Sequence, residues 1–568
     1  MINQFNVIGK DFIQEVSNYK ITRSSNIFRP KLKQQIGLNY GDSIKSVIKN
    51  PNILLLVSPY SRIKKESNES PVGRIEEMKR IGVPIGLLRI ATKLKNKYSV
   101  KIMDCAAEGF NNEKEIIPEI GLYRYGLDDT EILDKIKEIK PNIIGITVDY
   151  THQWGNARHL VDLIKDFDAS IIVILGGAHV TGDYLNAISD CSADYIVMCE
   201  GDIIIDNLLD ALTNKKDLSK VNGIVYKESN KIIITPKQSF IPDIDSLGVL
   251  DYSLIDLKLY SGSTHSAGQR KNKEGYCAYL STTIGCNTRC LFCTIPLVNG
   301  PFRRFSLNTL DKQLTQLSNL GVTEILIEDD NLLYDPMWTL EVCNLFKKHK
   351  VSWMEEGGIS LYSLIALYLG KNAVDIIGKE FNEPHYRLIK QAIDEGITIE
   401  QIIKEMADSG CYSVYLAIES SSEDCLIASG KPKINSYQHI TLDIIKLFKK
   451  YNIKVIGGFM IGFCMNEFTE SKEDILETTK YAKFLVDNGM DFANPFIVTP
   501  LPGTPMGEYQ MQFSVRDYDT GYSHELGTFD IPNSYTAKEV EILRWNLLIM
   551  ANSREKVNKI LETGTWPV

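Results

Sequence analysis

The alternation of short apolar runs with helix-length segments restricts the fold of this chain more than any other feature. The apolar runs in the first half of the chain are residues 52–58, 98–104, 142–148, 170–177 and 194–199. The segments of helical length between them are residues 84–96, 128–139, 155–168 and 202–213. Near-continuous apolar strands separated by helices are typical of a parallel sheet covered on both faces. Residues 50–215 are therefore predicted to form a five-strand, doubly wound, Rossmann-like α/β domain, with ligands at the carboxyl ends of the strands.

A second alternating series follows. Residues 216–276 change character and predict a linker that contains a hairpin. The strands predicted after the linker are residues 279–284, 324–329, 351–356, 413–419, 454–462 and 491–499. Six βα units of this kind predict a partial or full parallel (β/α)6 barrel over residues 277–505, with the chemistry in the loops that follow the strands. Residues 1–49 remain as an N-terminal extension and residues 506–568 as a small, mostly helical C-terminal region.

Composition narrows the class of protein. The 568 residues are 44% hydrophobic and 24% charged, which is ordinary for a globular protein. The net charge of -9 argues against a nucleic-acid surface, which needs clustered Lys and Arg. No apolar run reaches the roughly 18 residues that a membrane span needs. The N-terminus lacks the features of a secretory signal. We therefore expect a cytoplasmic protein with no membrane and no nucleic-acid partner.

Three of the eleven cysteines form a motif. The stretch TTIGCNTRCLFCTIP places Cys286, Cys290 and Cys293 directly after a predicted strand. Thiolates are the usual protein ligands of iron–sulfur clusters, and they also suit zinc. A structural zinc site needs a fourth ligand at close spacing, and none follows nearby. An iron–sulfur cluster is therefore predicted, with a zinc site or three packed core cysteines as the alternatives. The odd cysteine count argues against a disulfide framework.

The triad and its surroundings, over roughly residues 278–505, resemble the radical S-adenosylmethionine (SAM) enzymes. In that family C-x3-C-x-aromatic-C follows the first strand of a partial barrel and holds a 4Fe-4S cluster; the aromatic residue here is Phe292. The resemblance implies that Cys286, Cys290 and Cys293 are the catalytic metal ligands. Three cysteines leave one iron of the cluster without a protein ligand. The resemblance implies that this iron chelates SAM, whose reductive cleavage yields a 5'-deoxyadenosyl radical.

Further stretches carry the same resemblance. EILIEDD is similar to the segment that meets the SAM amino group, YLAIESSS to the one beside the methionine or ribose, and GFMIGF to the glycine motif beside the adenine. PLPGTP is similar to the end of the sixth strand. The residues that the resemblance assigns to SAM are Phe292, Glu328, Asp329, Glu419, Ser421, Gly458 and Gly462. An acid at a strand end, such as Asp329 or Asp330, is also often a helix N-cap.

The first domain resembles the cobalamin-binding domain that precedes the radical core in one branch of this family. The matching stretches are GVPIGLLRIATKL, KPNIIGITV, ILGGAHV and YIVMCEGD. Gly176 and Gly177 end a strand where the backbone must lie close to a bulky ligand, and Gly201 does so one strand later. A nucleotide or flavin could use such a domain, but no G-x-G-x-x-G follows the first strand. Cobalamin is therefore the expected cofactor.

One histidine, His152, lies near the predicted cobalamin site. Some cobalamin carriers supply an axial His from D-x-H-x-x-G after the first strand. Here DYTHQWG has Asp149, His152 and Gly155, one residue too long and after the third strand. The first-strand loop, SPYSRIKKESNESP, contains no histidine. We expect cobalamin without a His ligand from that motif and place His152 in the lining of the pocket. An axial ligand or an ordinary loop histidine are the alternatives.

Two features depart from the family pattern. About fifty residues separate Trp353 from Tyr412, and this insertion, about 359–400, belongs at the mouth of the barrel. Its apolar and aromatic content favours a substrate-specific cap over disorder, with a helical hairpin that only packs on the barrel as the alternative. Arg303 and Arg304 follow the cysteine motif. They could bind an anionic substrate group, or contact SAM or solvent.

The resemblance implies a cobalamin-dependent radical SAM C-methyltransferase. In the implied mechanism, one SAM methylates cob(I)alamin, and the deoxyadenosyl radical made from a second takes hydrogen from an unactivated carbon. That carbon then receives the methyl group of methylcobalamin. An external electron donor such as flavodoxin or ferredoxin would be needed. The expected substrate is a small natural-product intermediate, in particular a phosphonate. The alternatives are a radical rearrangement, ring contraction or cyclisation with the same cofactors, and a cobalamin-binding sensor with an inactive barrel.

Overall fold

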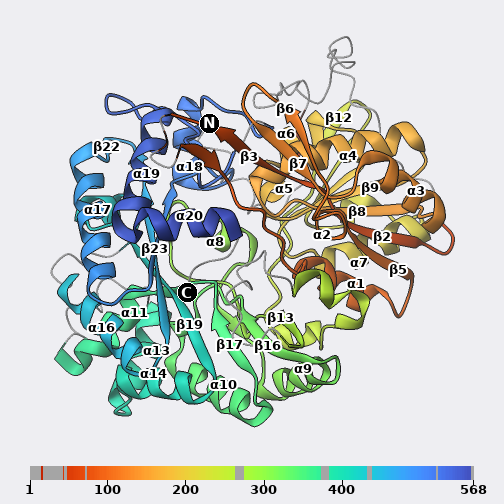
Figure 1. Cartoon of the computed structure of the whole chain (residues 1–568). Coiled ribbons are helices and arrows are strands. Elements are labelled where there is room, and N and C mark those ends of the chain that lie inside the picture. Colours follow the sequence, from red (N-terminus) through yellow and green to blue (C-terminus); the bar gives the residue numbers. More distant parts are fainter. Residues whose placement is uncertain are drawn as a thin grey trace.

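The computed structural model describes residues 14–16, 43, 48–68, 70, 73–261, 274–372, 383–431, 438–519 and 522–563. Most of the predicted N-terminal extension, 1–49, lies outside the described residues. In Figure 1 the α/β domain lies on the right, the parallel barrel at the lower left and the C-terminal helices at the upper left.

An eight-stranded sheet forms the centre of the first domain. Its order is β1 (Gln14–Val16), β12 (Lys231–Ile234), β11 (Ile224–Glu228), β10 (Tyr195–Val197), β9 (Ile172–Gly176), β8 (Ile143–Thr147), β2 (Asn52–Val57) and β5 (Ser99–Asp104). The last five strands are parallel, which confirms the predicted doubly wound arrangement. The hairpin β11–β12 and strand β1 extend the sheet antiparallel at one edge. The chain changes direction between β2 and β8, where ligands bind in folds of this kind.

Helices cover both faces of this sheet, as near-continuous apolar strands require. One face packs under α1 (Ile85–Leu94) and α7 (Gly201–Asn214). The other face packs under α3 (Asp129–Ile139), α4 (Trp154–Phe167), α5 (Ala178–Gly182) and α6 (Tyr184–Asp190). The four predicted helices begin within one residue of their predicted positions, whereas α2, α5 and α6 were not predicted. At α3, for example, Asp128 and Glu131 form a reciprocal capping box.

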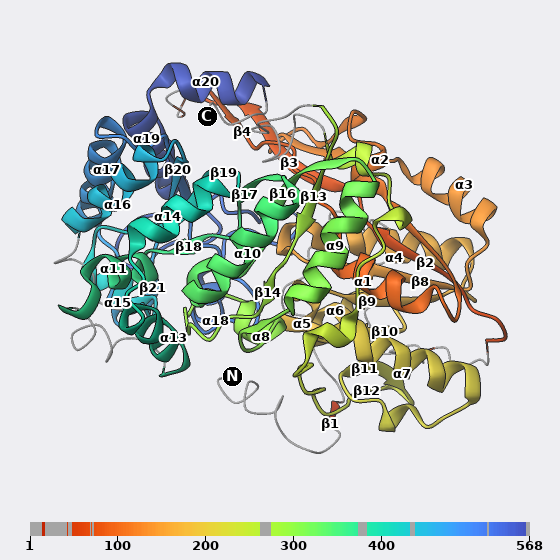
Figure 2. The same cartoon turned by 90° about the horizontal axis from the view of Figure 1, so that it is seen from below.

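A second, antiparallel sheet grows out of the carboxyl ends of β2 and β5. Its order is β4 (Arg74–Glu76), β3 (Tyr60–Glu66), β7 (Leu122–Tyr125) and β6 (Glu113–Ile117), and the short α2 (Cys105–Glu108) leads into it. The interpretation of residues 58–71 as a loop was therefore wrong. The strand YSRIKKE is mostly polar and its partner β7 is far along the chain, so local periodicity carries little signal. Figure 2 shows β3 and β4 reaching towards α20 (Arg554–Thr563).

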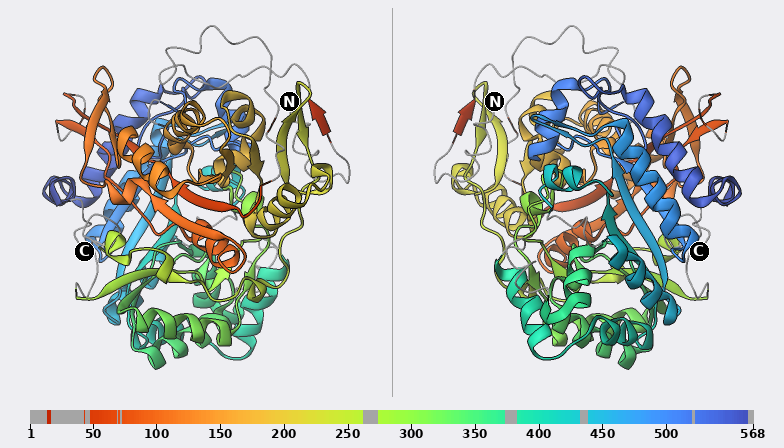
Figure 3. Two further views of the ribbon diagram at one scale, coloured as in Figure 1. Left: turned by 90° about the vertical axis from the view of Figure 1, so that its right-hand side faces the viewer. Right: turned by 90° about the vertical axis from the view of Figure 1, so that its left-hand side faces the viewer.

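The barrel consists of six parallel strands with open edges. Their order is β13 (Tyr276–Leu280), β16 (Val322–Ile327), β17 (Ser352–Glu355), β19 (Cys411–Glu419), β20 (Lys454–Ile461) and β23 (Phe492–Ile497). The covering helices are α9 (Leu307–Asn319), α10 (Pro336–His349), α14 (Ile399–Asp408), α16 (Gln438–Lys450) and α17 (Lys472–Asp487). In the left view of Figure 3 the α/β domain faces the viewer with green barrel helices below it. The predicted partial barrel is confirmed.

The insertion contributes to the core of the barrel. It contains β18 (Ile359–Ser360), which pairs with β19, then α11 (Leu361–Leu369) and α13 (Glu383–Asp394); residues 373–382 lie outside the described residues. All the α11 residues from Leu361 to Leu367 are buried. A helix that is apolar all round belongs inside a core rather than on a rim. Helix α11 therefore packs into the core, and whether the insertion also caps a substrate stays a prediction.

The C-terminal region is helical at both ends and irregular between them. It begins with α18 (Pro505–Gln510) and ends with α19 (Ala537–Asn552) and α20. Helix α19 packs on α17 and β23, where the Asn552 side chain bonds both to the N–H and to the C=O of Ala493. The irregular segment between α18 and α19 passes back to the α/β domain.

Candidate active site

The loop that carries the cysteine triad is fixed at its base by two aspartates. Asp329, just after β16, accepts hydrogen bonds from the backbone N–H and hydroxyl of Thr282 and from the N–H of Thr283. Asp330 accepts from the N–H of Gly285 at 2.7 Å. Gly285 has φ of +87°, and a Cβ there would lie 2.1 Å from the Pro301 carbonyl oxygen. Only glycine therefore lets the chain turn into the loop at this point.

The three cysteines share one small region, and each is partly exposed. The Cys286 sulfur accepts from the N–H of Thr288 at 3.4 Å, as a thiolate ligand can. Burial raises the pKa of all three thiols, to about 11 for Cys290, where nearby Lys431 opposes the rise. The neighbouring sulfurs raise the pKa of Cys293 further, so the three lie within electrostatic reach of one another. A polynuclear cluster, whose iron replaces the protons, fits this donor set.

Phe292 packs against the end of the fifth barrel strand. Its ring meets Phe463 edge to face at 6.4 Å, in a cluster that includes Val498 and Met506. The ring therefore anchors the triad loop to the ends of β20 and β23. The loop is also tied to other segments by backbone, since Leu291 donates to Ser429 and accepts from Met506.

The end of β19 carries a buried ion pair close to the triad. Glu419, with φ of +69°, pairs with Lys431. Burial lowers the pKa of Lys431, but Glu419 and Cys290 outweigh this effect, so the pKa is raised overall and the amine stays charged. The Lys431 ammonium also lies 5.7 Å from the Phe292 ring centre and 5.8 Å from that of Tyr362, on α11. Lys431 was not identified from the sequence, because its stretch SGKPK has no motif that signals a ligand.

The remaining residues assigned to SAM differ in how available they are. Asp329 is engaged with Thr282 and Thr283, as described above, whereas Glu328 keeps an accessible side chain. The protein atoms packed around Glu328 displace much of its hydration although solvent still reaches the side chain, which raises its pKa well above the usual range, and the adjacent Glu356 raises it too. Ser421 bonds to the hydroxyl of Thr478 at 3.1 Å.

Gly458 and Gly462, in and just after β20, are each required as glycine for a different structural reason. A Cβ at Gly458 would lie 2.4 Å from the Tyr415 hydroxyl, so this glycine makes room for the tyrosine. Gly462 has φ of +92°, and its N–H donates to Glu470. Both glycines thus shape the end of β20, whatever ligand lies beside it.

The α/β domain brings its candidate residues to the strand ends, as predicted. Gly177 has φ of +105°, and a Cβ there would lie 2.6 Å from the Val148 carbonyl oxygen, so backbone crowding by itself requires glycine. A Cβ at Gly176 would meet only the Val197 oxygen, at 3.8 Å, which leaves space for a ligand. Gly201 opens α7, and a Cβ there would make ordinary contacts with Ile90 and Val197.

A pocket with about 530 Å³ of empty space, part of it open to solvent, lies between the two domains. From the α/β domain it is lined by residues 149–152 and by Ala178 and His179. From the barrel it is lined by Thr294, next to Cys293, and by segment 499–502, and a third wall is residues 522–524. The pocket thus joins the strand ends of one domain to the cysteine loop of the other.

His152 lines this pocket. Its ring stacks on Tyr150 at 5.6 Å and meets Tyr60 edge to face. Burial, with a smaller contribution from nearby Arg80, lowers the pKa of His152 to about 3 and that of His524 to about 4. Both imidazoles are therefore neutral at physiological pH.

The third wall was missed by the sequence interpretation. Tyr522 donates to the Pro500 carbonyl at 2.7 Å, and His524 bonds to the Thr499 hydroxyl at 3.0 Å. These contacts attach the C-terminal segment to the end of the sixth strand. No local sequence pattern predicts this wall, because its residues contact a strand end that lies more than 20 residues earlier in the chain.

Two protein families match this chain, one for each domain. The B12 binding domain family matches residues 72–209, and the radical SAM superfamily matches residues 280–482. The chain is a B12-binding radical SAM protein. The cofactors implied by this combination are cobalamin, SAM and a 4Fe-4S cluster, and the donor set of Cys286, Cys290 and Cys293 suits the cluster.

Relatives of this B12-binding radical SAM protein extend over both domains. An uncharacterized methyltransferase of Pyrococcus horikoshii is 26% identical over 464 residues, covering 80% of this chain and 82% of the relative. The cytidylyl-2-hydroxyethylphosphonate methyltransferase of Streptomyces wedmorensis is 25% identical over 500 residues, covering 82% and 85%. The interpretation as a radical SAM enzyme of the methyltransferase kind is confirmed.

Solved structures share its fold. The radical SAM methyltransferase TsrM from Kitasatospora setae superposes with a TM-score of 0.56 at 15% identity, covering 82% of this chain and 77% of that one. The cobalamin-dependent SAM radical enzyme OxsB gives a TM-score of 0.55 at 14% identity, covering 77% and 52%. Within the described part of the B12-binding radical SAM protein, no helix combines the length and apolarity needed to cross a membrane.

Proposed function

We propose that this chain is a cobalamin-dependent radical SAM C-methyltransferase acting on an unactivated carbon of a small natural-product intermediate, in particular a phosphonate. The observation that carries the proposal is the pocket that reaches from residues 149–152 to Thr294, beside the triad. A substrate held there would face the strand ends of both domains. When bound, the cluster supplies the electron that cleaves SAM, and cobalamin carries the methyl group.

The residues of the chain would bind, orient and shield. Cys286, Cys290 and Cys293 hold the cluster, and Phe292 packs their loop against the barrel. The buried charges of Lys431 and Glu419 suit the carboxylate and amino groups of SAM, because opposite charges close together in a dry site attract strongly. Glu328 can accept from the same amino group.

Further residues complete the two cofactor sites in this proposal. Ser421, Gly458 and Gly462 border the remainder of SAM. Gly176, Gly177, Gly201 and His152 border cobalamin, with His152 as a lining residue rather than a metal ligand. Walls from three segments limit the access of water, which protects a radical from side reactions.

The substrate class draws support from one cation and one relative. Arg80 is close enough to lower the pKa of both His152 and His524, and it pairs with Glu525 at 2.8 Å. A guanidinium there suits a phosphonate or phosphate oxygen. The Streptomyces wedmorensis relative is named for a cytidylyl phosphonate substrate. We therefore propose a small phosphonate rather than a nucleic acid, a cytoplasmic site of action, and flavodoxin or ferredoxin as electron donor.

The test uses full-length protein reconstituted anaerobically with iron, sulfide and cobalamin. It should bind about four irons. After reduction it should cleave SAM to 5'-deoxyadenosine and transfer a CD3 group from labelled SAM to a cytidylyl phosphonate. Changing the three triad cysteines together to Ala should abolish iron binding and cleavage. The matched control is Cys343→Ala, because Cys343 is buried in α10, outside the triad loop.

Each other outcome would contradict part of the proposal. Iron retained by the triple variant would refute the assignment of the ligands. An isomeric product without the label would indicate a rearrangement instead of methylation. Absence of SAM cleavage by the reduced wild-type protein would favour a cobalamin-binding sensor with an inactive barrel.

A further inference from the structure

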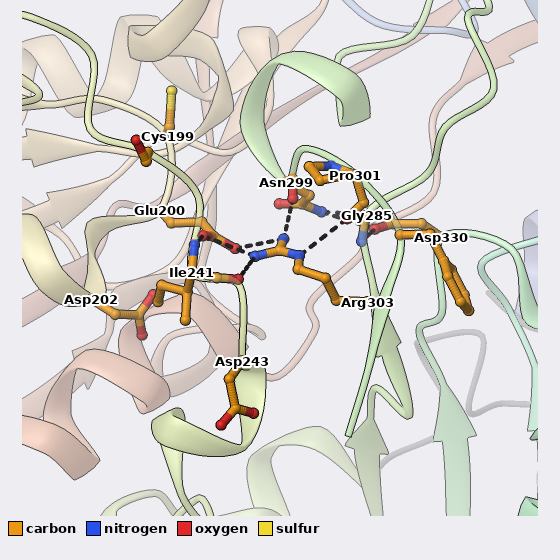
Figure 4. A network of polar contacts seen from close by, with 12 residues as sticks. Cys199, Glu200, Asp202, Ile241, Asp243, Gly285, Asn299, Pro301, Arg303 and Asp330 are labelled. Carbon is orange, nitrogen blue, oxygen red and sulfur yellow. Dashed lines mark hydrogen bonds and ion pairs between the residues drawn. The ribbon is translucent and has the colours of Figure 1, made fainter. Parts of the chain in front are cut away.

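Arg303 is an arginine buried between the two domains (Figure 4). It lies in the short strand β15 (Arg303–Arg304), which pairs with β14 (Thr283–Ile284). These two strands flank the triad loop on its two sides. The Arg303 side chain is only 7% exposed, so its guanidinium must be satisfied by protein groups. It is not available to an anionic substrate, as the sequence had suggested it could be.

On the barrel side, the guanidinium bonds to the backbone of residues 299–301, which lead from the triad loop back to β15. Its Nε donates to the Pro301 carbonyl at 3.0 Å, and Nη2 donates to the Asn299 carbonyl. Between these residues is Gly300, whose carbonyl accepts from the N–H of Cys286 at 3.1 Å. Arg303 is thus one backbone step from the first cysteine of the triad.

On the α/β side, the same guanidinium meets an acid from the cobalamin-binding domain. Glu200 lies between β10 and α7, and its carboxylate oxygens are 2.8 and 3.1 Å from Nη2 and Nη1 of Arg303. Nη1 also donates to the Ile241 carbonyl at 2.7 Å, while the Ile241 N–H donates to Glu200. Figure 4 shows the guanidinium between Glu200 on one side and Asn299 and Pro301 on the other.

This pattern uses the particular chemistry of arginine. A planar guanidinium can serve a carboxylate and three carbonyls at once, whereas the three donors of a lysine ammonium cannot reproduce that planar geometry. The neighbouring Arg304 differs, because its side chain is 51% exposed and pairs with Asp335 within the barrel. The two adjacent arginines therefore provide a matched pair, one bridging domains and one not.

The geometry points to Arg303 as a positioning residue that sets the triad loop at a fixed distance from the cobalamin-binding domain. The inference deepens the proposed function and rests on its two cofactors acting on one carbon. Displacement of a reacting group by about 1 Å can cost on the order of 100-fold in rate. A bridge from Glu200 to the backbone beside Cys286 resists such a displacement without touching substrate.

The test compares Arg303→Lys with Arg304→Lys in the full-length protein loaded with cluster and cobalamin. The primary measurement is the EPR dipolar interaction between the cobalt(II) of cobalamin and the reduced cluster, which reports their separation without any turnover. Arg303→Lys should broaden the distribution of separations, and Arg304→Lys should leave it as in the wild type. Once a substrate is known, the ratio of deoxyadenosine to methylated product should rise on the order of 10-fold for Arg303→Lys alone.

A second variant guards against simple misfolding. Glu200→Gln keeps an oxygen for the Ile241 N–H but removes the charge that pairs with Arg303, so it should broaden the separations in the same way. Circular dichroism and iron content identify variants that are folded and loaded. A folded, loaded Arg303→Lys protein with the wild-type distribution overturns the inference. If the separations broaden but no substrate is methylated, the inference stands and the proposed function fails.

Discussion

Four carboxylates of the barrel accept hydrogen bonds from backbone N–H groups, which leaves their neighbours as the candidates for a ligand. Asp329 and Asp330 fix the base of the triad loop, and Glu355 accepts from the N–H groups of Gly358 and Tyr415. Glu470 accepts from Gly462 and Phe463 at the end of the fifth strand. Asp329 is not the helix N-cap that a strand-ending acid often is, because it accepts from Thr282 and Thr283 instead. Glu328 beside it stays the candidate for SAM.

The pH dependence of stability provides a test of Glu470. Burial raises the pKa of Glu470 from 4.5 to about 8. The folded state therefore binds a proton that the unfolded state releases, and stability is lost as the pH rises from about 5 through 8, by up to about 1.4 kcal/mol per pH unit. Glu470→Gln stays neutral, so its melting temperature should fall less between pH 5 and pH 9. The control Glu473→Gln, exposed in the first turn of α17 just after Glu470, should follow the wild type, and identical slopes for all three proteins would refute the raised pKa.

At the scale of residues, a ligand set can be predicted from the sequence when its members lie close together along the chain. The spacing of Cys286, Cys290 and Cys293 is local, so the whole motif can be read from one short stretch of sequence. Lys431 could not be found in this way, because its role depends on contact with Glu419 and on the arrival of Tyr362 from α11. Spatial convergence of this kind has no sequence period.

At the scale of elements, the parallel strands were predictable because each is a short apolar run bounded by polar residues. The antiparallel sheet of β3, β4, β6 and β7 was not, since its strands are mixed in polarity and its pairings join segments on either side of α1. This sheet brings Tyr60 to the side of His152, so it forms part of the border of the pocket region. Helix α11 shows the opposite case: its apolar content was read correctly, but its place in the core could be known only from packing.

A glycine pair at the end of β9 separates structural from ligand effects. Gly177→Ala should lower the melting temperature, because its positive φ costs a side-chain residue about 1–2 kcal/mol and the Cβ would overlap the Val148 carbonyl. Gly176→Ala meets no close atom, so the fold should be kept. If cobalamin approaches this backbone, Gly176→Ala should still weaken its binding. An absorbance titration with cobalamin beside a thermal melt measures both, and wild-type affinity in Gly176→Ala would place the ligand elsewhere.

The whole molecule is held together by the C-terminal segment as well as by the covalent linker. Gly155, on α4, lies so close to this segment that a Cβ would be 2.5 Å from the Asp519 carboxylate. Arg158, on the same helix and 0% exposed, pairs with Asp519 at 2.5 Å and with Asp190 at 2.7 Å. The segment then continues to Tyr522 and His524 in the pocket wall. The predicted domains were visible in the sequence, but this fastening across them was not, because its partners are hundreds of residues apart.

The ion pair between Arg158 and Asp519 yields a prediction for the pocket as a whole. Asp519→Ala leaves part of the Arg158 charge without its partner in a dry interior, and breaking such a buried pair costs about 3 kcal/mol. Asp190 remains to hold Arg158 in place, so the loss should fall mainly on the docking of the segment and not on the α/β fold. Limited proteolysis within residues 511–535 should become faster, and a ligand of the pocket should bind more weakly, because the wall at 522–524 is released. The control is Asp166→Ala, which removes an exposed acid from α4, the helix that carries Arg158. If Asp519→Ala resists protease as the wild type does, the contacts of Tyr522 and His524 with the barrel alone must hold the wall, and the domains would be fastened from that side only.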